Sequence, residues 1–142
     1  MIDVREVRDD AERAAAMAIR HAVFVGEQQV PVELELDGRD DEAVHLVAVR
    51  EGTVVATCRL LGHDTAVHLG RLAVDPAARR QGVARLLLEH AEAWARGHGA
   101  RRLTLSAQTY ATGLYVAAGY ATVGEPYLEA GIEHIDMERD LG

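Results

Sequence analysis

The sequence has few of the features that would assign it to a specialised class of protein. It holds one cysteine, Cys58, so it cannot form an intramolecular disulfide, and nothing points to an oxidising compartment. No apolar run approaches the roughly 20 residues of a membrane-spanning helix, and residues 1–5 do not begin the apolar core of a signal peptide. The net charge of −8 argues against nucleic acid or an anionic membrane as the main partner. We therefore expect a cytoplasmic protein.

Aromatic residues are also scarce, since only six of the 142 residues are Phe, Trp or Tyr. The core must therefore consist mainly of Leu, Val, Ile and Ala, and the length suits one domain over residues 1–142. Charge is spread unevenly, with carboxylates crowded into residues 33–42 and a basic island in the middle of the chain. This island comprises Arg71, Arg79, Arg80 and Arg85. A basic island in an acidic chain suits an anionic ligand, although a solvated surface is the alternative.

Hydrophobic periodicity and turn residues predict a mixed sheet with helices on its faces. Strands are expected at residues 2–7, 43–50, 54–61, 67–74, 102–107, 120–123 and 132–139. A helix is expected from residue 10 onward, with Asp9 or Asp10 as its cap, and residues 20–29 either extend it or form a second helix. Further helices are expected at residues 83–96 and 112–118. Loops are expected at residues 33–42 and 124–131, with turns at Gly52 and at Gly62 and Asp64.

Residues 75–84 join a predicted strand to a predicted helix and carry the strongest functional signal. The first N–H groups of a helix lack intrahelical partners and the helix dipole favours negative charge, so a phosphate can bind there. Gly82 and Ala84 would allow close approach, and Arg79 and Arg80 would add charged contacts. The G-x-x-x-x-G-K-[ST] pattern is absent, and no G-x-G-x-x-G follows an early strand. An ordinary turn with surface arginines is the alternative interpretation.

Several segments resemble the GNAT superfamily, the acetyl-CoA-dependent N-acyltransferases. Residues 79–84 (RRQGVA) fit its R/Q-x-x-G-x-G/A signature, residues 71–76 resemble the strand before it, and residues 115–120 (YVAAGY) resemble its F/L-Y-x-x-x-G-F/Y. Residues 20–31 (RHAVFVGEQQVP), 35–40 and 129–137 (EAGIEHIDM) are similar to stretches of the bacterial ElaA/YjcF-like subgroup. The resemblance covers nearly the whole chain.

This resemblance implies an α/β (α+β) fold: a mixed, largely antiparallel six- to seven-stranded sheet flanked by about four helices, with strands 4 and 5 splayed. It implies transfer of an acetyl group from acetyl-CoA to a primary amine of a small molecule by direct attack, without an acyl-enzyme. A protein lysine or N-terminal amine is an alternative acceptor, and an acyl-CoA-binding module without turnover is an alternative function. Superfamily members are often dimers, so a homodimer is also an expectation.

The resemblance also assigns roles to residues. It places Tyr115 near the cofactor sulfur as general acid, with a packing tyrosine as the alternative. His134 is the candidate general base or else a packing histidine, and His68, Glu129 or a water are alternatives to it. The oxyanion donor is expected to be a main-chain N–H around residues 72–74. Cys58 is interpreted as a small buried hydrophobe, because direct attack needs no cysteine.

The remaining site residues follow from the same resemblance. The expected cofactor contacts are Leu72, Ala73, Val74, Arg79, Arg80, Gln81, Gly82, Val83, Ala84, Arg85 and Gln108, the last standing where many members carry Asn. The expected acceptor contacts are Arg20, Phe24, Gln28, Glu35 and Glu129. Glu35 or Asp37 could hold a cationic amine, although a solvated acidic loop is the alternative. No metal site is expected.

Overall fold

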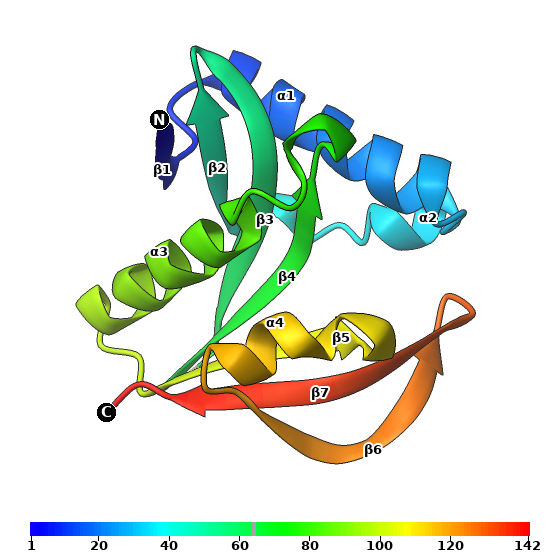
Figure 1. The fold of residues 1–142 in the computed structure, drawn as a ribbon, viewed down its shortest axis with the longest axis vertical. Helices are drawn as coiled ribbons and strands as arrows, with labels where there is room; N and C mark the ends of the chain where they lie inside the picture. Colours follow the sequence, from blue (N-terminus) through cyan, green and yellow to red (C-terminus); the bar gives the residue numbers. More distant parts are fainter. Residues whose placement is uncertain (64) are drawn as a thin grey trace.

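A seven-stranded sheet forms the centre of the protein, in a computed structural model that describes residues 1–63, without the side chain of His63, and residues 65–142 (Figure 1). The strands are β1 (Ile2–Glu6), β2 (Val44–Arg50), β3 (Thr53–His63), β4 (Ala66–Val74), β5 (Arg102–Gln108), β6 (Ala121–Glu129) and β7 (Ile132–Asp140). Their order is β1-β2-β3-β4-β5-β7-β6, and the pairs are antiparallel except for parallel β4 and β5. The predicted mixed, largely antiparallel sheet is confirmed. The turn residue Asp64 lies outside the described residues.

The helices lie mostly where periodicity predicts them. They are α1 (Asp10–Arg20), the π-helix η1 (His21–Glu27), α2 (Val32–Glu35), α3 (Val83–Gly97) and α4 (Thr112–Ala117), with 3-10 turns η2 (Asp40–Glu42), η3 (Pro76–Ala78) and η4 (Thr109–Ala111). Asp9 caps α1, because its side chain accepts a hydrogen bond from the Glu12 N–H at 2.8 Å. η1 follows α1 directly, so the extension interpretation of residues 20–29 is confirmed. No described helix combines the length and the apolar character that crossing a membrane requires.

Helices cover both faces of the sheet around β2. Leu46 and Ala48 are buried in the large cluster that includes the inner face of α3, whereas Val47 and Val49 are buried with Ala16 of α1. Alternate strand residues point to opposite faces, so α1 and α3 lie on opposite sides (Figure 1). This explains the nearly continuous apolar run of β2, because both of its faces are buried.

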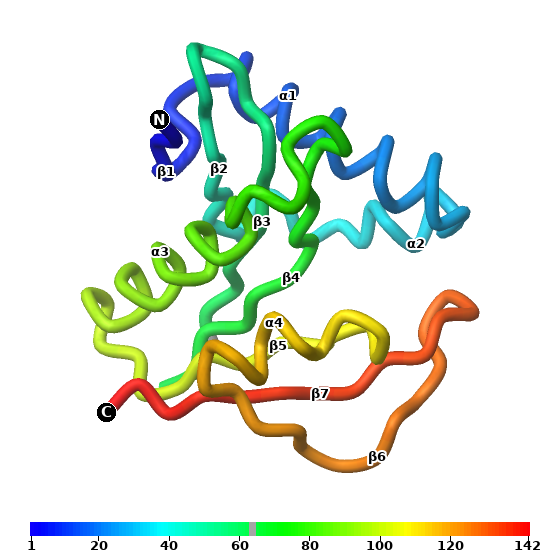
Figure 2. The backbone as a smooth tube through the Cα atoms, in the orientation of Figure 1, coloured from blue at the N-terminus to red at the C-terminus, as the bar shows by residue number. Residues whose placement is uncertain are grey.

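The centre of the sheet opens between β4 and β5. The two strands pair where Ala66–Leu69 face Arg102–Leu105, and they then diverge (Figure 2). A bulge lies in the diverging part of β4: Thr57 pairs with Ala73 and Arg59 with Gly70, so two residues of β4, Arg71 and Leu72, oppose Cys58. Such a bulge bends its strand and increases the local twist. The predicted splay of strands 4 and 5 is confirmed.

Two loop predictions are wrong. Residues 124–131 are mostly strand, since β6 runs to Glu129 and turns into β7 at Ala130 and Gly131, both with positive φ. β6 is an edge strand with every residue exposed, so it shows no alternating pattern, and an irregular register before Tyr127 accommodates Gly124 and Pro126. Residues 33–42 contain η2 and most of α2.

Candidate active site

A cleft of about 1050 Å³ lies where β4 and β5 diverge. Its walls come from η1, the bulged end of β4, the end of β5, α4 and the β6–β7 hairpin. It brings together most of the predicted site residues: Phe24, Gln28, Glu35, Leu72, Ala73, Val74, Arg79, Ala84, Gln108, Tyr115, Glu129 and His134, together with the alternative base His68. Segments more than 100 residues apart in sequence therefore meet in one cleft.

The start of α3 has the geometry of an anion site. Asp75 caps the preceding turn η3, since its side chain accepts from the Ala77 N–H at 2.9 Å. Gly82 is the N-cap of α3 at φ +77°, and among the described residues no side chain caps it, so the first N–H groups of α3 can bind a ligand. A Cβ at Gly82 would meet open space, so glycine is required there for its backbone conformation and not for packing.

The polar residues around this loop are held by long-range contacts. Arg79 forms a two-bonded pair with Glu27 of η1, with Nη1 3.0 Å from Oε2, and its Nε donates to the Val74 carbonyl at 3.0 Å. Gln81 accepts from Arg50 and donates to the Ala77 carbonyl. Sequence reasoning did not identify Glu27 as the partner of Arg79, because no local pattern connects residues 52 positions apart.

Five of the predicted cofactor contacts lie beside the cleft and not in its lining. Arg80, Gln81, Gly82 and Arg85 are near the helix start, and Arg85 pairs with Glu89 one turn along α3. Val83 is 1% exposed and packs in the core, so only its main chain is available to a ligand. The predicted contact through Val83 is therefore restricted to its N–H group.

Tyr115 borders the cleft from α4. Its ring is 8% exposed and packs edge-on against Tyr120, with ring centroids 6.0 Å apart. Within residues 1–63 and 65–142, nothing forms a hydrogen bond with its hydroxyl. Burial raises the pKa of Tyr115 to about 12. The phenol therefore stays protonated at neutral pH and can donate to a group in the cleft.

His134 and His68 present imidazoles to the same cleft. His134 Nδ1 lies 2.7 Å from the Ile132 carbonyl, and a carbonyl can only accept, so Nδ1 carries the proton and Nε2 of the neutral ring is the basic atom. The ring stacks on Tyr127 with centroids 6.1 Å apart. His68 Nδ1 lies 2.8 Å from Thr104 Oγ1, and burial lowers the pKa of His68, which favours its neutral form.

Gln28 and Gln108 form a pair between η1 and the end of β5. Gln108 Nε2 donates to Gln28 Oε1 at 2.7 Å, and the reverse amide contact is 3.4 Å. The two residues were predicted to contact acceptor and cofactor respectively, and the structure places their side chains together in the cleft wall.

Arg20 and Glu35 form a buried pair, and the prediction for Arg20 needs a correction. Arg20 is 1% exposed, bonds Glu35 Oε2 at 2.8 Å and Asp40 Oδ1 at 2.7 Å, and is not among the residues that line the cleft. The prediction that Arg20 contacts the acceptor does not fit this burial. Glu35 is 4% exposed, which also contradicts the solvated-loop alternative at that position. Arg20 was misassigned because the pattern identifies polar residues without revealing whether they pair inside the protein.

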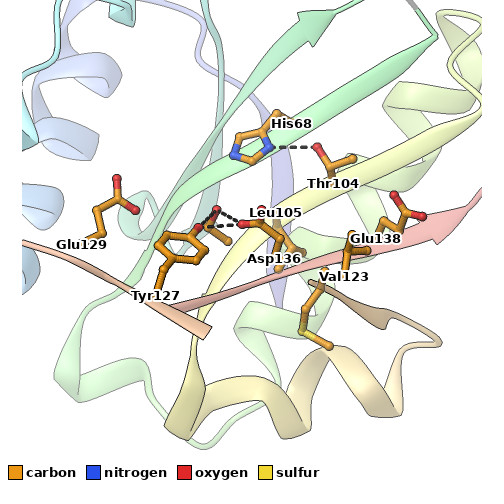
Figure 3. A pocket seen from close by; sticks show the side chains of 10 residues that line it. His68, Thr104, Leu105, Val123, Tyr127, Glu129, Asp136 and Glu138 are labelled. Atoms are coloured by element: carbon orange, nitrogen blue, oxygen red, sulfur yellow. Dashed lines mark hydrogen bonds between the residues drawn. The ribbon is translucent and has the colours of Figure 1, made fainter. Parts of the chain in front are cut away.

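A second hollow of about 410 Å³ adjoins the cleft, and His68 and Glu129 line both (Figure 3). Asp136 Oδ1 lies 2.6 Å from the Tyr127 hydroxyl and accepts from Ser106 at 2.9 Å. The three carboxylates around the hollow are Glu129, Asp136 and Glu138, and no described residue that lines it is an arginine. Glu138 also pairs with Arg102 at 3.7 Å, so Glu129 and Asp136 give the hollow its negative lining next to the cleft.

Comparison with known proteins agrees with this geometry. The model of the family described as "Acetyltransferase (GNAT) domain" matches residues 7–141. The uncharacterized N-acetyltransferase YjcF of Bacillus subtilis is 33% identical over 134 residues, which cover 94% of this chain and 96% of YjcF.

Solved structures give the same result. An acyl-CoA N-acyltransferase from Pseudomonas aeruginosa is similar with a TM-score of 0.87 and 34% identity, covering 98% of this chain and 99% of that one. ElaA from Escherichia coli is similar with a TM-score of 0.88 and 29% identity, covering 99% of this chain and all of ElaA. Sequence and fold thus agree along nearly the full length, and the chain belongs to the GNAT acetyltransferase family, in its ElaA/YjcF-like group.

Proposed function

We propose that the protein is an acetyl-CoA-dependent N-acetyltransferase that acetylates a primary amine of a small molecule by direct attack. The observation that carries the proposal is the cleft itself, which joins a phosphate-binding helix start to a protonated phenol and two imidazoles. The family supplies the acyl-CoA donor and the acyl-transfer chemistry. The acetyl group, the amine and the residue roles are the proposed parts.

The chain's own groups can hold the cofactor at two places. The free N–H groups at the start of α3 would bind the pyrophosphate, with Arg79 and Arg80 at the rim. The gap beyond the paired part of β4 and β5 would take the acyl arm, and Gln108 at its edge offers an amide contact. Acetyl-CoA supplies a thioester, whose carbonyl carbon is the atom attacked.

Transfer requires one bond to form and one to break. The amine nitrogen bonds to the carbonyl carbon, the carbon–sulfur bond breaks, and the proton lost by the amine must be received by a base. We assign this role to Nε2 of His134, either directly or through a water. One main-chain N–H around residues 72–74 would stabilise the oxyanion, because these residues line the cleft.

Tyr115 then supplies the proton or hydrogen bond that the departing sulfur needs. A simple thiol has a pKa of about 8.5 in water, so full proton transfer from a phenol with a pKa of about 12 is uphill there. The apolar surroundings that raise the pKa of Tyr115 would also raise that of the thiol. Proton transfer is then less uphill, and Tyr115 acts as the general acid through a hydrogen bond to the leaving sulfur.

The negative hollow supports a cationic acceptor. Its carboxylates adjoin the cleft through Glu129 and His68, so a second positive charge on the acceptor would be stabilised close to the reacting amine. A small diamine fits this arrangement better than an anionic acceptor. A protein lysine or N-terminus remains the alternative acceptor, and an acyl-CoA-binding module without turnover is the alternative function.

The test measures thiol release from acetyl-CoA against a panel of mono- and diamines and a lysine-containing peptide. The chain contains no lysine, so any acetyl-lysine in the peptide assay comes from the acceptor. Acceptor-dependent release, largest for a small diamine, is expected. Tight cofactor binding without release from any acceptor would instead support the binding module.

The base is tested with His134→Ala and, in parallel, His68→Ala. We expect His134→Ala to lower kcat and remove the fall in rate at low pH, while His68→Ala keeps the shape of the pH profile. If His134→Ala leaves both the rate and its pH profile intact, then His134 is not the base.

A further inference from the structure

The bulge in β4 holds one residue in an unusual conformation. Arg71 has φ +54°, in the left-handed region that residues with a side chain seldom adopt outside turns. It lies where two residues of β4 oppose Cys58. Directly after it come Leu72, Ala73 and Val74, which line the cleft. Such a conformation persists only when surrounding contacts fix it, and it often marks a functional constraint.

The side chain of Arg71 is bound by the segment around α2. Its Nε donates to Glu35 Oε2 at 2.8 Å, and its Nη2 donates to the main-chain carbonyls of Glu35 at 3.1 Å and Leu34 at 3.3 Å. Arg71 Nη2 also donates to Asp37 Oδ2 at 3.4 Å. One guanidinium thus joins the bulge to a segment more than 30 residues away in sequence.

Glu35 is in turn fixed from the other side. Arg20 of α1 donates to the same Glu35 Oε2 from Nη2 at 2.8 Å and from Nε at 3.1 Å. Glu35 therefore bridges α1 and the bulge, and a carboxylate that receives bonds from two guanidiniums has little freedom to move.

Asp37 and Asp40 complete the group with Arg59 of β3. Arg59 Nη1 lies 2.8 Å from Asp37 Oδ1 and 3.1 Å from Asp40 Oδ1, and Asp40 also pairs with Arg20. We call this set the bulge clamp; its members are Arg20, Glu35, Asp37, Asp40, Arg59 and Arg71. Three arginines balance three carboxylates, so the clamp carries no net charge, and its members Arg20, Glu35 and Arg59 are buried.

We propose that Glu35 and Arg71 are positioning residues, and that the bulge clamp holds β4 in the shape that aims the oxyanion-binding main-chain N–H around residues 72–74 into the cleft. Neither side chain needs to touch the acceptor for this role. The catalytic part of this inference rests on the proposed acetyl transfer, whereas the effect on the shape of β4 does not.

Two substitutions distinguish the effect of the clamp on β4 from a general loss of stability. Arg71→Asn keeps a residue that tolerates positive φ but is too short to reach Glu35, and it leaves the pair of Glu35 and Arg20 intact. Glu35→Gln removes the charge at the centre of the clamp. Arg71→Lys can still make one bond to Glu35 and should restore part of the lost rate. Arg13→Ala, which breaks the exposed pair with Asp41, is the matched control.

The expected result has two independent parts. Arg71→Asn and Glu35→Gln should lower kcat tenfold or more, with the Kd for CoA changed less than threefold, in samples shown to be folded by circular dichroism. Hydrogen–deuterium exchange of a peptide covering residues 72–74 should be at least fivefold faster than in the unsubstituted protein. Arg13→Ala should change neither quantity.

Unchanged exchange and unchanged kcat in folded Arg71→Asn would overturn the proposal. If Glu35→Gln does not fold, Arg71→Asn alone decides, because it leaves the buried pair in place. If the unsubstituted protein turns over no acceptor, the proposed function fails, and the exchange comparison still decides whether the clamp shapes β4.

Discussion

Two neighbouring tyrosines should respond in opposite ways to the loss of one hydroxyl group. Tyr115 borders the cleft, and no described residue forms a hydrogen bond with its hydroxyl. Tyr120 packs against it, is 4% exposed, and donates to Glu92 Oε2 at 2.7 Å. Tyr115→Phe should therefore impair catalysis without destabilising the protein, whereas Tyr120→Phe should do the reverse.

The magnitudes follow from these contacts. Tyr115→Phe removes no hydrogen bond within the described structure, so the free energy of unfolding should change by less than about 0.5 kcal/mol. Losing a general acid should lower kcat tenfold or more, and tenfold corresponds to about 1.4 kcal/mol of barrier. Tyr120→Phe leaves the buried carboxylate of Glu92 without one of its two donors, which costs about 1.5–3 kcal/mol. For a chain of this size, Tm should fall by about 5–10 °C.

The assay combines thermal unfolding with steady-state rates at a saturating acceptor and a titration of CoA. Tyr115→Phe should keep its Tm and its Kd for CoA, and Tyr120→Phe should keep its kcat at 25 °C. An unchanged kcat in Tyr115→Phe would refute the general-acid role. A large fall in Tm for Tyr115→Phe would mean that its hydroxyl has a structural partner.

Three further predictions concern a cysteine, an aspartate and a glycine. Burial raises the pKa of Cys58 to about 12, so iodoacetamide should not label the folded protein. Cys58→Ala should keep kcat within about twofold, and a larger fall in kcat would contradict direct attack. The Arg59 guanidinium holds the pKa of Asp37 well below its usual range. The stability that Asp37 contributes is therefore complete above about pH 4 and is lost as the pH falls toward the folded-state pKa of Asp37. Equal free energies of unfolding in urea at pH 5 and pH 3 would be inconsistent with this. Gly82→Ala should cost about 1–2 kcal/mol because of its positive φ and should weaken CoA binding in a calorimetric titration.

The sequence by itself determined the elements whose signals are local. The start of α3 was predicted because a strand, a turn with Gly82 and an amphipathic helix follow each other directly. The strands β2 to β5 were predicted for the same reason, and so was a cap of α1 at Asp9 or Asp10, of which Asp9 is the cap. The family resemblance then supplied the splay of the sheet and nominated Tyr115 and His134, which no periodicity could identify.

Only the tertiary structure decided which polar residues pair with each other. Arg79 meets Glu27 across 52 positions, and Arg71 meets Glu35 across 36, and such pairs leave no local signal. Arg20 was assigned to the acceptor because its charge is visible in the sequence while its burial is not. The extension of the edge strand β6 beyond residue 123 was missed for a related reason: with no face buried, it has no alternating pattern to recognise. Local chemistry therefore predicts where an anion can bind, whereas long-range packing determines the shape of the cleft around it.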